Sequence, residues 1–351
     1  MPQSVPLPPD TSVPDPRDYR TSDPLAQRIW DYVSRSQLGS LWNFEGTPVK
    51  VVLKRTAKAF IDDDLVSRAA ELGFYFFFAL FPLLICASSI VGLTARSASA
   101  VYDKLLHALA VMVPPSAYHL VINTFNETTQ ASTGGKAVLG FLAALWSASM
   151  GFSAIQDTLN LVYKVRETRP YWKAHAIAIL VTILLAAIAT LNLAVMFAGD
   201  LVADRVYEHI WHRTLRISLM IGVYVITAII AFGLLMLMFS TTYYYAPDLK
   251  KKCWHWLTPG AAFAIITWML ASLGLRAYLH FFNTYSLTYG SLGAVVILLM
   301  WFYITGLTLL TGAELNSEIQ ASVAEKRLKE AGTLPPEATA DPENPLPVPV
   351  S

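Results

Sequence analysis

The sequence has few charged residues for its length. Asp, Glu, Lys and Arg make up 15% of its 351 residues, whereas 54% are hydrophobic. A soluble globular chain carries about 25% charged residues, so this composition disfavours an ordinary soluble enzyme. The formal net charge is only +1, and we therefore expect no nucleic-acid partner. The two cysteines, Cys86 in an apolar run and Cys253 near three lysines, offer no framework of disulfides.

Motifs for common chemistry are missing as well. No G-x-S-x-G, G-x-x-x-x-G-K-[ST] or G-x-G-x-x-G pattern occurs, so hydrolase, P-loop and dinucleotide-binding functions have no support. Among the seven histidines only His209 and His212 are close together, and H-E-x-x-H is absent. We expect no metal site, no cofactor and no enzymatic activity. Any transport by this chain would not be driven by an ATPase of its own.

Long apolar runs lie between two proline-rich ends. Residues 1–47 and 326–351 are expected to be disordered tails, because such segments bury too little apolar surface to offset chain entropy. Four runs between them contain no Asp, Glu, Lys or Arg: Gly73–Leu93, Ala137–Gln156, Ala176–Gly199 and Ile217–Pro247. A fifth run, Pro259–Ala313, contains only Arg276 and is broken by polar residues at 283–286.

These runs predict an all-α polytopic membrane protein, because a bilayer core requires about 20 apolar residues in a helix. We predict one domain at residues 48–325 with six transmembrane helices, at about 70–94, 137–160, 175–199, 216–241, 259–281 and 290–313. Short amphipathic helices are expected in the first outer loop, on either side of Pro114-Pro115. Residues 49–60 are expected to form an amphipathic helix, either at the cytoplasmic interface or packed on the bundle.

Lys and Arg near the predicted spans give the orientation. Fourteen lie on one side and five on the other, which predicts that both termini are cytoplasmic. Membrane lipids are therefore its expected surroundings. The sequence gives no oligomeric state.

Polar residues near the span ends fall on the predicted cytoplasmic side. They are Glu71, Gln156, Asp157, Asn160, Tyr244, Asp248, Glu314 and Asn316. We interpret them as a polar vestibule, with Asp157 as its key member because Gln156 and Asn160 flank it within one helical turn. The alternative is that they are helix-end groups, bonded to one another and to nearby Lys and Arg residues. Asp62, Asp63 and Asp64 are expected only to favour the start of the first span.

Two further positions stand out inside the predicted spans. Arg276 lies one or two turns inside the outer face, where it either extends to the headgroups or faces the bundle and pairs with an anionic substrate or headgroup. Pro82 interrupts the first span and predicts a helix kink.

Several stretches together resemble the YihY/BrkB family of bacterial inner-membrane proteins. The first is RAAELGFYFFFALFP at residues 68–82, and the second is WSASMGFSAIQDTLNLVY at 146–163, followed by RPYW at 169–172. YYYAPD at 243–248, PGA at 259–261, YGSLG at 289–293 and GAELN at 312–316 follow in the same order. The resemblance covers roughly residues 50–325.

The resemblance implies a six-span protein of the bacterial inner membrane. The family carries an old ribonuclease label and a virulence label, and some members are connected with export of envelope lipids. Our leading hypothesis is a transporter or flippase-like carrier of a lipid or another amphipathic or anionic solute. A structural or assembly protein is the alternative. A ribonuclease has the least support, since a nuclease needs clustered metal or acid–base groups and a basic track.

Overall fold

The computed structural model describes residues 24–35, 41–42, 46–94, 123, 134–209, 212–281 and 291–332, with the side chains of α3 described as far as Leu80. All regular structure in this part of the chain is helical. Its helices are α1 (Pro24–Arg35), α2 (Val49–Asp62), α3 (Leu65–Thr94), α6 (Gly134–Val162), α7 (Tyr171–His209), α8 (Arg213–Tyr245), α9 (Pro259–Phe281) and α11 (Ser291–Glu330).

Five of the described helices are long and apolar enough to cross a membrane: α6, α7, α8, α9 and α11. They coincide with predicted spans two to six. The first predicted span falls within α3, a helix of 30 residues. The all-helical, multi-pass class is thus confirmed, while the sixth crossing remains a prediction.

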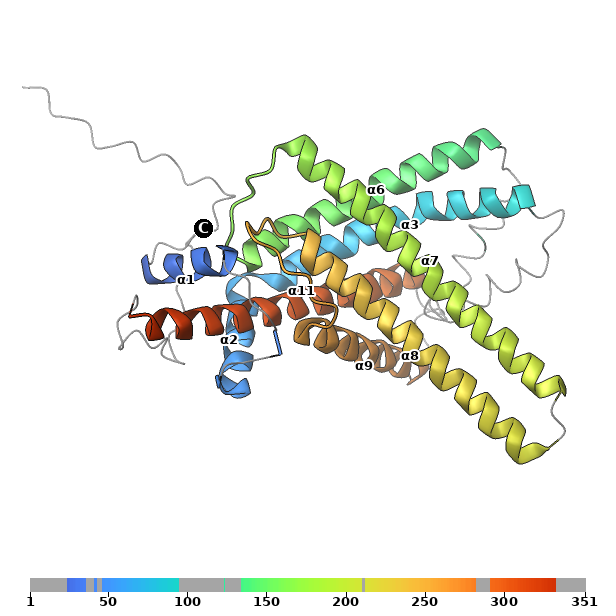
Figure 1. The fold of residues 1–351 in the computed structure, drawn as a ribbon. Helices are drawn as coiled ribbons and strands as arrows, with labels where there is room; N and C mark the ends of the chain where they lie inside the picture. The colour runs from blue at the N-terminus through green and yellow to red at the C-terminus, as the bar shows by residue number, and fades with distance from the viewer. Residues whose placement is uncertain are drawn as a thin grey trace, which may run out of the picture.

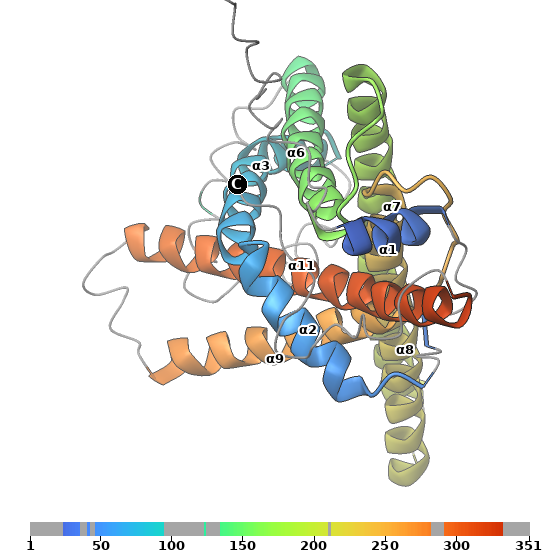
Figure 2. The ribbon, with the colours of Figure 1, turned by 90° about the vertical axis from the view of Figure 1, so that its left-hand side faces the viewer.

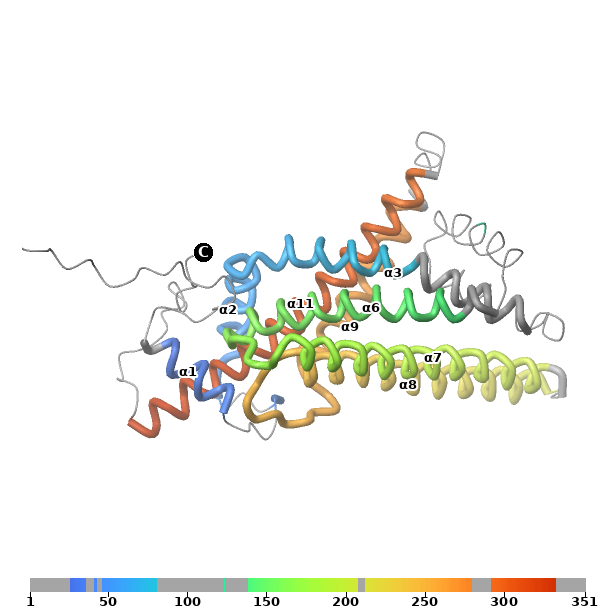
Figure 3. The backbone as a smooth tube through the Cα atoms, turned by 90° about the horizontal axis from the view of Figure 1, so that it is seen from above, coloured from blue at the N-terminus to red at the C-terminus, as the bar shows by residue number. Residues whose placement is uncertain are grey.

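The helices meet at one end and diverge toward the other (Figure 1). α3 packs against α6 and α11, α7 packs against α8, and α9 packs against α11. Seen from above, the α9–α11 pair points away from the α7–α8 pair (Figure 3). The loops that connect α6 with α7 and α8 with α9 both lie at the end where the helices meet.

The short helices α1 and α2 cover this common end. Both contact the C-terminal part of α11, which extends beyond the predicted last span (Figure 2). Because α2 runs across the bundle and α3 turns away from it, a tight connection is needed at Asp63 and Asp64, and Asp64 has a positive φ of 50°.

Helix α1 corrects part of the predicted N-terminal tail. Residues 24–35 are expected to be disordered, but they form an amphipathic helix whose buried apolar side chains are Ala26, Ile29, Trp30 and Val33. These positions follow the i, i+3, i+4, i+7 spacing of one helical face, and they join the main hydrophobic core. The first 27 residues contain seven prolines, and this composition outweighs the short helical spacing of apolar residues at 26–33.

Some predictions lie outside the described residues. The amphipathic helices expected around Pro114-Pro115 fall in the stretch 95–133, of which only position 123 is described. Pro82 lies within α3, but its side chain is not described, so the predicted kink is not tested. The helix predicted at 49–60 is present as α2, with Val52 and Thr56 buried.

Candidate functional site

An open groove of about 740 Å³ lies where the helices meet. Three segments line it: α1, the α6–α7 loop and the start of the α8–α9 loop. Its charged lining residues are Asp31, Lys164, Arg166, Glu167, Asp248 and Lys250. The volume is within the range of small-molecule sites, and the lining carries both signs of charge.

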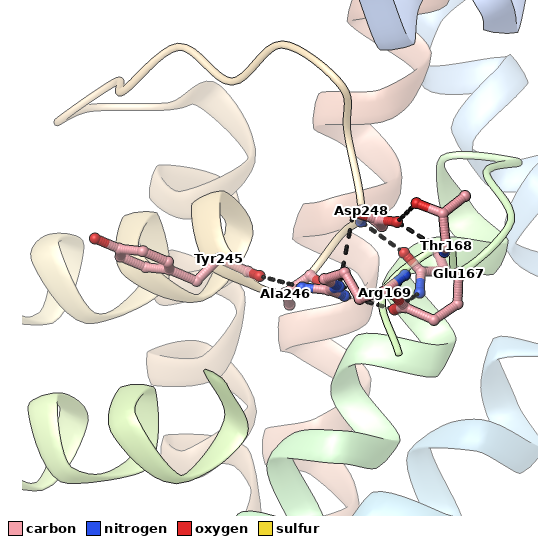
Figure 4. A network of polar contacts seen from close by, with 7 residues as sticks. Glu167, Thr168, Arg169, Tyr245, Ala246 and Asp248 are labelled. Atoms are coloured by element: carbon pink, nitrogen blue, oxygen red, sulfur yellow. Dashed lines mark hydrogen bonds and ion pairs between the residues drawn. The ribbon is translucent and has the colours of Figure 1, made fainter. Parts of the chain in front are cut away.

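Arg169 holds the two loops of the groove together (Figure 4). Its Nε and Nη2 atoms donate to the two carboxylate oxygens of Glu167 at 2.7 and 2.6 Å. Nη2 also donates to the carbonyl of Ala246 at 3.0 Å, and Nη1 to that of Tyr245 at 3.4 Å. Nε lies 3.6 Å from Asp248. The planar guanidinium thus makes a bidentate pair and caps the end of α8 simultaneously.

The position of Arg169 follows from helix physics. The last carbonyl groups of a helix have no partner within the helix and carry partial negative charge, so a cation is favourable there. Burial lowers the pKa of Arg169, but the hydrogen bonds and charge of Glu167, with Asp248, more than offset burial and raise the pKa above its usual value. The guanidinium therefore stays charged although its side chain is only 8% exposed.

Asn160 connects α6 to the same network. Its Nδ2 donates to Glu167 at 2.9 Å, and its Oδ1 accepts the backbone N–H of Asp248 at 2.8 Å. Thr168 donates to the Asp248 carboxylate from its backbone N–H at 2.8 Å and from its hydroxyl at 2.5 Å. Asn160 and Asp248, both predicted vestibule residues, are thus brought into one network.

The C-terminus of α6 explains how Lys164 reaches its partner. The N–H of Val165 bonds to the carbonyl of Asn160, and that of Lys164 to the carbonyl of Leu161, which is the Schellman pattern of a helix end. Lys164 occupies the left-handed position, with φ of 51°, that usually favours glycine. Its ammonium forms a salt bridge with Asp63 in the α2–α3 connection.

The sequence suggested only that Asp63 favours the start of the first span, but the structure gives it a buried ion pair as well. Its residue is only 3% exposed, and its Oδ2 has no hydrogen-bond partner. Burial raises the pKa of Asp63, and the Lys164 ammonium opposes this rise. Glu314, which is 1% exposed, and the buried Glu318 of α11 lie within electrostatic reach of Asp63 and Lys164. We call Asp63, Lys164, Glu314 and Glu318 the acidic cluster.

A second, smaller cavity of about 60 Å³ lies beside the groove. Tyr244 and Asn316, two predicted vestibule residues, line it together with Tyr163, Lys252 and Gln320. Asn316 Oδ1 accepts the backbone N–H of Gly260 at 2.9 Å and so joins α11 to the start of α9. Lys252 has a pKa lowered to about 8, first by burial and then by the charge of Arg169.

The remaining predicted site residues make fewer of these contacts. Glu71 on α3 and Asp157 on α6 are exposed, and the charge of Asp157 reaches Arg169. Gln156 is buried, and its Nε2 has no hydrogen-bond partner. Arg276 is exposed near the far end of α9.

Several central residues were not among the predicted site residues. Arg169 and Glu167 lie in a loop, where their contacts with a distant loop leave no periodic signal. Lys164 was expected only as a general partner of helix ends, and Asp63 only as a helix-start residue. Within the described ranges, no group of three or more His, Cys, Asp or Glu side chains has an arrangement that suits a metal ion.

Comparison with known proteins assigns the family. The sequence model of the family described as Virulence factor BrkB matches residues 56–334. The chain belongs to the BrkB family. The matched range begins within α2 and includes the acidic cluster, the Arg169 network and both cavity-forming loops, whereas α1 lies before it.

BrkB-family relatives carry different names. The chain is 32% identical over 255 residues to the ribonuclease-like protein YfkH of Bacillus subtilis (strain 168), covering 72% of this chain and 88% of YfkH. It is 29% identical over 269 residues to the UPF0761 membrane protein Smlt0865 of Stenotrophomonas maltophilia (strain K279a), covering 75% of this chain and 59% of that protein. A UPF0761 membrane protein of Xanthomonas campestris pv. campestris (strain B100) is 28% identical over 290 residues, 80% of this chain and 62% of the relative.

The chain thus spans about three-fifths of the length of these two UPF0761 relatives. No solved structure matches the chain. The comparisons therefore establish an integral membrane protein of the BrkB type.

Proposed function

We propose that this protein is a carrier of a lipid or another amphipathic or anionic solute in the bacterial inner membrane. The observation that carries the proposal is the groove of about 740 Å³ at the end where the apolar helices meet. In this proposal a charged headgroup binds beside Arg166 and Lys250. The helices diverge away from the groove (Figure 1), and their exposed apolar side chains contact the acyl chain. Membrane lipids are then both the surroundings and the candidate substrate class.

The proposed topology has six crossings with both termini in the cytoplasm. Five described helices meet the requirements for crossing, and α3 supplies the sixth crossing. The groove then faces the cytoplasm, because the α6–α7 and α8–α9 loops carry the Lys and Arg residues that mark the cytoplasmic side. A carrier of this kind has no ATPase of its own and depends on a gradient or on a partner.

A structural or assembly role is the second candidate, and one observation favours it. The carboxylates of Glu167 and Asp248 are bonded to Arg169, Thr168 and Asn160 within the protein, so this network serves to join helices. The proposal therefore depends on Arg166 and Lys250, which line the groove, rather than on the network. We propose no ribonuclease activity, since the groove lining lacks a continuous basic track.

Lipid translocation by purified protein tests the proposal. Protein in vesicles of phosphatidylethanolamine and phosphatidylglycerol, with a trace of fluorescent phosphatidylglycerol, is expected to make inner-leaflet label accessible to an impermeant quencher. Arg166→Glu with Lys250→Glu is expected to reduce this rate about tenfold or more, because the headgroup then meets like charge. Lys54→Glu is the matched control, since Lys54 is exposed on α2 and does not line the groove. Equal rates with and without protein would refute the carrier.

A further inference from the structure

The acidic cluster and three charged neighbours, Arg55, Glu325 and Lys329, together carry more negative than positive charge. Four carboxylates, Asp63, Glu314, Glu318 and Glu325, face three cations, Lys164, Arg55 and Lys329. Asp62 and Arg68 also face Asp63 and offset each other. Because isolated charges are costly to bury, this count leaves one negative charge to be neutralised.

The ion pairs of Glu325 show which carboxylates lack a compensating cation. Glu325 accepts a hydrogen bond from Arg55 at 2.7 Å and another from Lys329 at 2.7 Å, so two cations are committed to one carboxylate. Lys164 then serves Asp63, Glu314 and Glu318 with only long-range help from Arg55. The uncompensated negative charge therefore lies on the carboxylates nearest Lys164.

Two oxygen atoms in this place have no hydrogen-bond partner. They are Oδ2 of Asp63 and Oε2 of Glu314, both buried. Ser317 reaches only the other oxygen of Glu314, at 3.4 Å. A buried carboxylate oxygen without a donor is expensive when ionised, whereas a protonated carboxyl group both removes the charge and becomes a donor itself.

The small cavity reaches Tyr163, a neighbour of the acidic cluster. Tyr163 and Gln320 line the cavity, and the Tyr163 hydroxyl lies 3.4 Å from Gln320 Nε2. Tyr163 also lies within electrostatic reach of Glu314. Burial, and then the charge of Glu314, raise the pKa of the Tyr163 hydroxyl. About 60 Å³ accommodates a few water molecules, which can deliver a proton as far as Tyr163.

We propose that Asp63 and Glu314, with Lys164, form a proton-binding site that holds one proton at neutral pH. The proton comes from solvent: an O–H bond forms at a carboxylate oxygen as an O–H bond of a hydronium ion breaks, and a water molecule is released. A metal cation does not fit as well, because no described group of three or more acidic, His or Cys side chains surrounds a common point. The use of this proton to drive transport rests on the proposed function, whereas proton binding does not.

Infrared spectroscopy of the purified full chain tests proton binding directly. Ordinary Asp and Glu side chains are ionised at pH 7, so a C=O stretching band of a protonated carboxyl group at that pH reports an unusual site. We expect the band in the wild-type protein and its loss in Glu314→Gln. Asp63→Asn is the second variant, should the first fail to fold, and it is expected to lose the band as well, because Lys164 then fully compensates Glu314.

Glu330→Gln is the matched control on the same helix, because Glu330 is exposed at the end of α11. It is expected to keep the band. Absence of the band in the wild type, or its persistence in both cluster variants, would overturn the proposal. Loss of the band when sodium chloride replaces choline chloride would also overturn it, in favour of a cation site.

A transport measurement separates this inference from the proposed function. If the band is present but lipid translocation is absent, the proton site stands and the carrier fails. If translocation occurs and ignores an imposed pH gradient while the band is present, the site binds a proton without coupling it.

Discussion

Single side chains at the common end connect segments that are far apart in the sequence. Arg169 joins the α6–α7 loop to the end of α8. Asn160 bonds to Glu167 of that loop and accepts the backbone N–H of Asp248, just after α8. The polar groups of this network form hydrogen bonds with partners on other elements. The network therefore fixes the relative position of α6 and α8 more strictly than apolar packing alone. Such a network is costly to break at any one member.

Replacing Arg169 is expected to destabilise the protein strongly. Arg169→Gln leaves Glu167 and Asp248 close together without their cation and leaves the Ala246 carbonyl without its donor, so we expect a loss of roughly 3 kcal/mol in the free energy of unfolding. Arg35→Gln is the control: its ion pair with Asp31 is exposed, and its loss is expected to cost less than about 1 kcal/mol. Thermal or denaturant unfolding in detergent compares the two, and equal effects would contradict the assigned role.

Lys252 provides a prediction that depends on pH. Its pKa is lowered to about 8 in the folded protein by burial and by Arg169, whereas an unfolded lysine titrates near 10.4. Below pH 8 the protonated side chain therefore costs stability in full, and this cost disappears as the pH rises from about 8 to about 10.4. Lys252→Met is expected to be more stable than the wild type at pH 7 and to lose that advantage at pH 10.

The control for this measurement is Lys251→Met, since Lys251 is exposed beside Lys252. Its midpoint temperature is expected to follow the wild type across the whole pH range. If Lys252→Met stabilises the protein equally from pH 6 to pH 10, the cost of holding a protonated Lys252 is not the cause of the stabilisation.

Among the helices, α9 and α11 make an unusually close crossing. A Cβ atom added to Gly260 would lie 1.9 Å from the carbonyl oxygen of Gly312 and 2.6 Å from Asn316. Small residues permit such backbone contact between membrane helices. The crossing also aligns the Gly260 N–H with Asn316, so packing and hydrogen bonding depend on the same glycine.

Gly260→Ala is accordingly expected to destabilise the protein by about 1–3 kcal/mol, because backbone must move to admit the methyl group. Gly274→Ala on the same helix is the matched control, since nothing lies within 4 Å of its added Cβ. Removing a glycine from a helix interior favours the helix by up to about 1 kcal/mol, so this control should be neutral or slightly stabilising. Unfolding of both variants in detergent measures the contrast, and a neutral Gly260→Ala would disprove the close crossing.

The sequence predicted long helices well and individual contacts less well. Runs of some 20 apolar residues are decisive for a membrane helix, whichever neighbours they have. The partner of Lys164, by contrast, depends on how the α2–α3 connection folds back against the end of α6, 101 positions away. Asn160 and Asp248 are polar residues next to apolar runs and are therefore conspicuous in the sequence, whereas Arg169 lies in a loop that is rich in charged residues.

At the scale of the whole molecule, the polar contacts are concentrated at one end. The Arg169 network, the acidic cluster and both cavities lie where α1, α2 and the loops cover the helices, while much of α7 and α8 exposes apolar side chains. In a bilayer, such an arrangement suits a rigid polar base on one side and helices embedded in lipid. The side on which this base lies decides between the proposed topology and its inverse.

Labelling and reporter fusions determine that side and the number of crossings. Cys253 lies in the α8–α9 loop, partly exposed, and His212 is exposed between α7 and α8. In a Cys86→Ser background, an impermeant thiol reagent is expected to label His212→Cys in intact cells, but to label Cys253 only after the cells are opened. A reporter that is active only outside the cytoplasm is expected to be active when fused at residue 120 and silent at residue 330, because the five helices α6 to α11 that separate these positions all cross. The reverse pattern would invert the topology, and silence at both positions would mean that an even number of these five helices cross. Lys54→Cys on α2 tests α3 in the same background: it is expected to be labelled only after the cells are opened, and labelling in intact cells would mean that α3 does not cross.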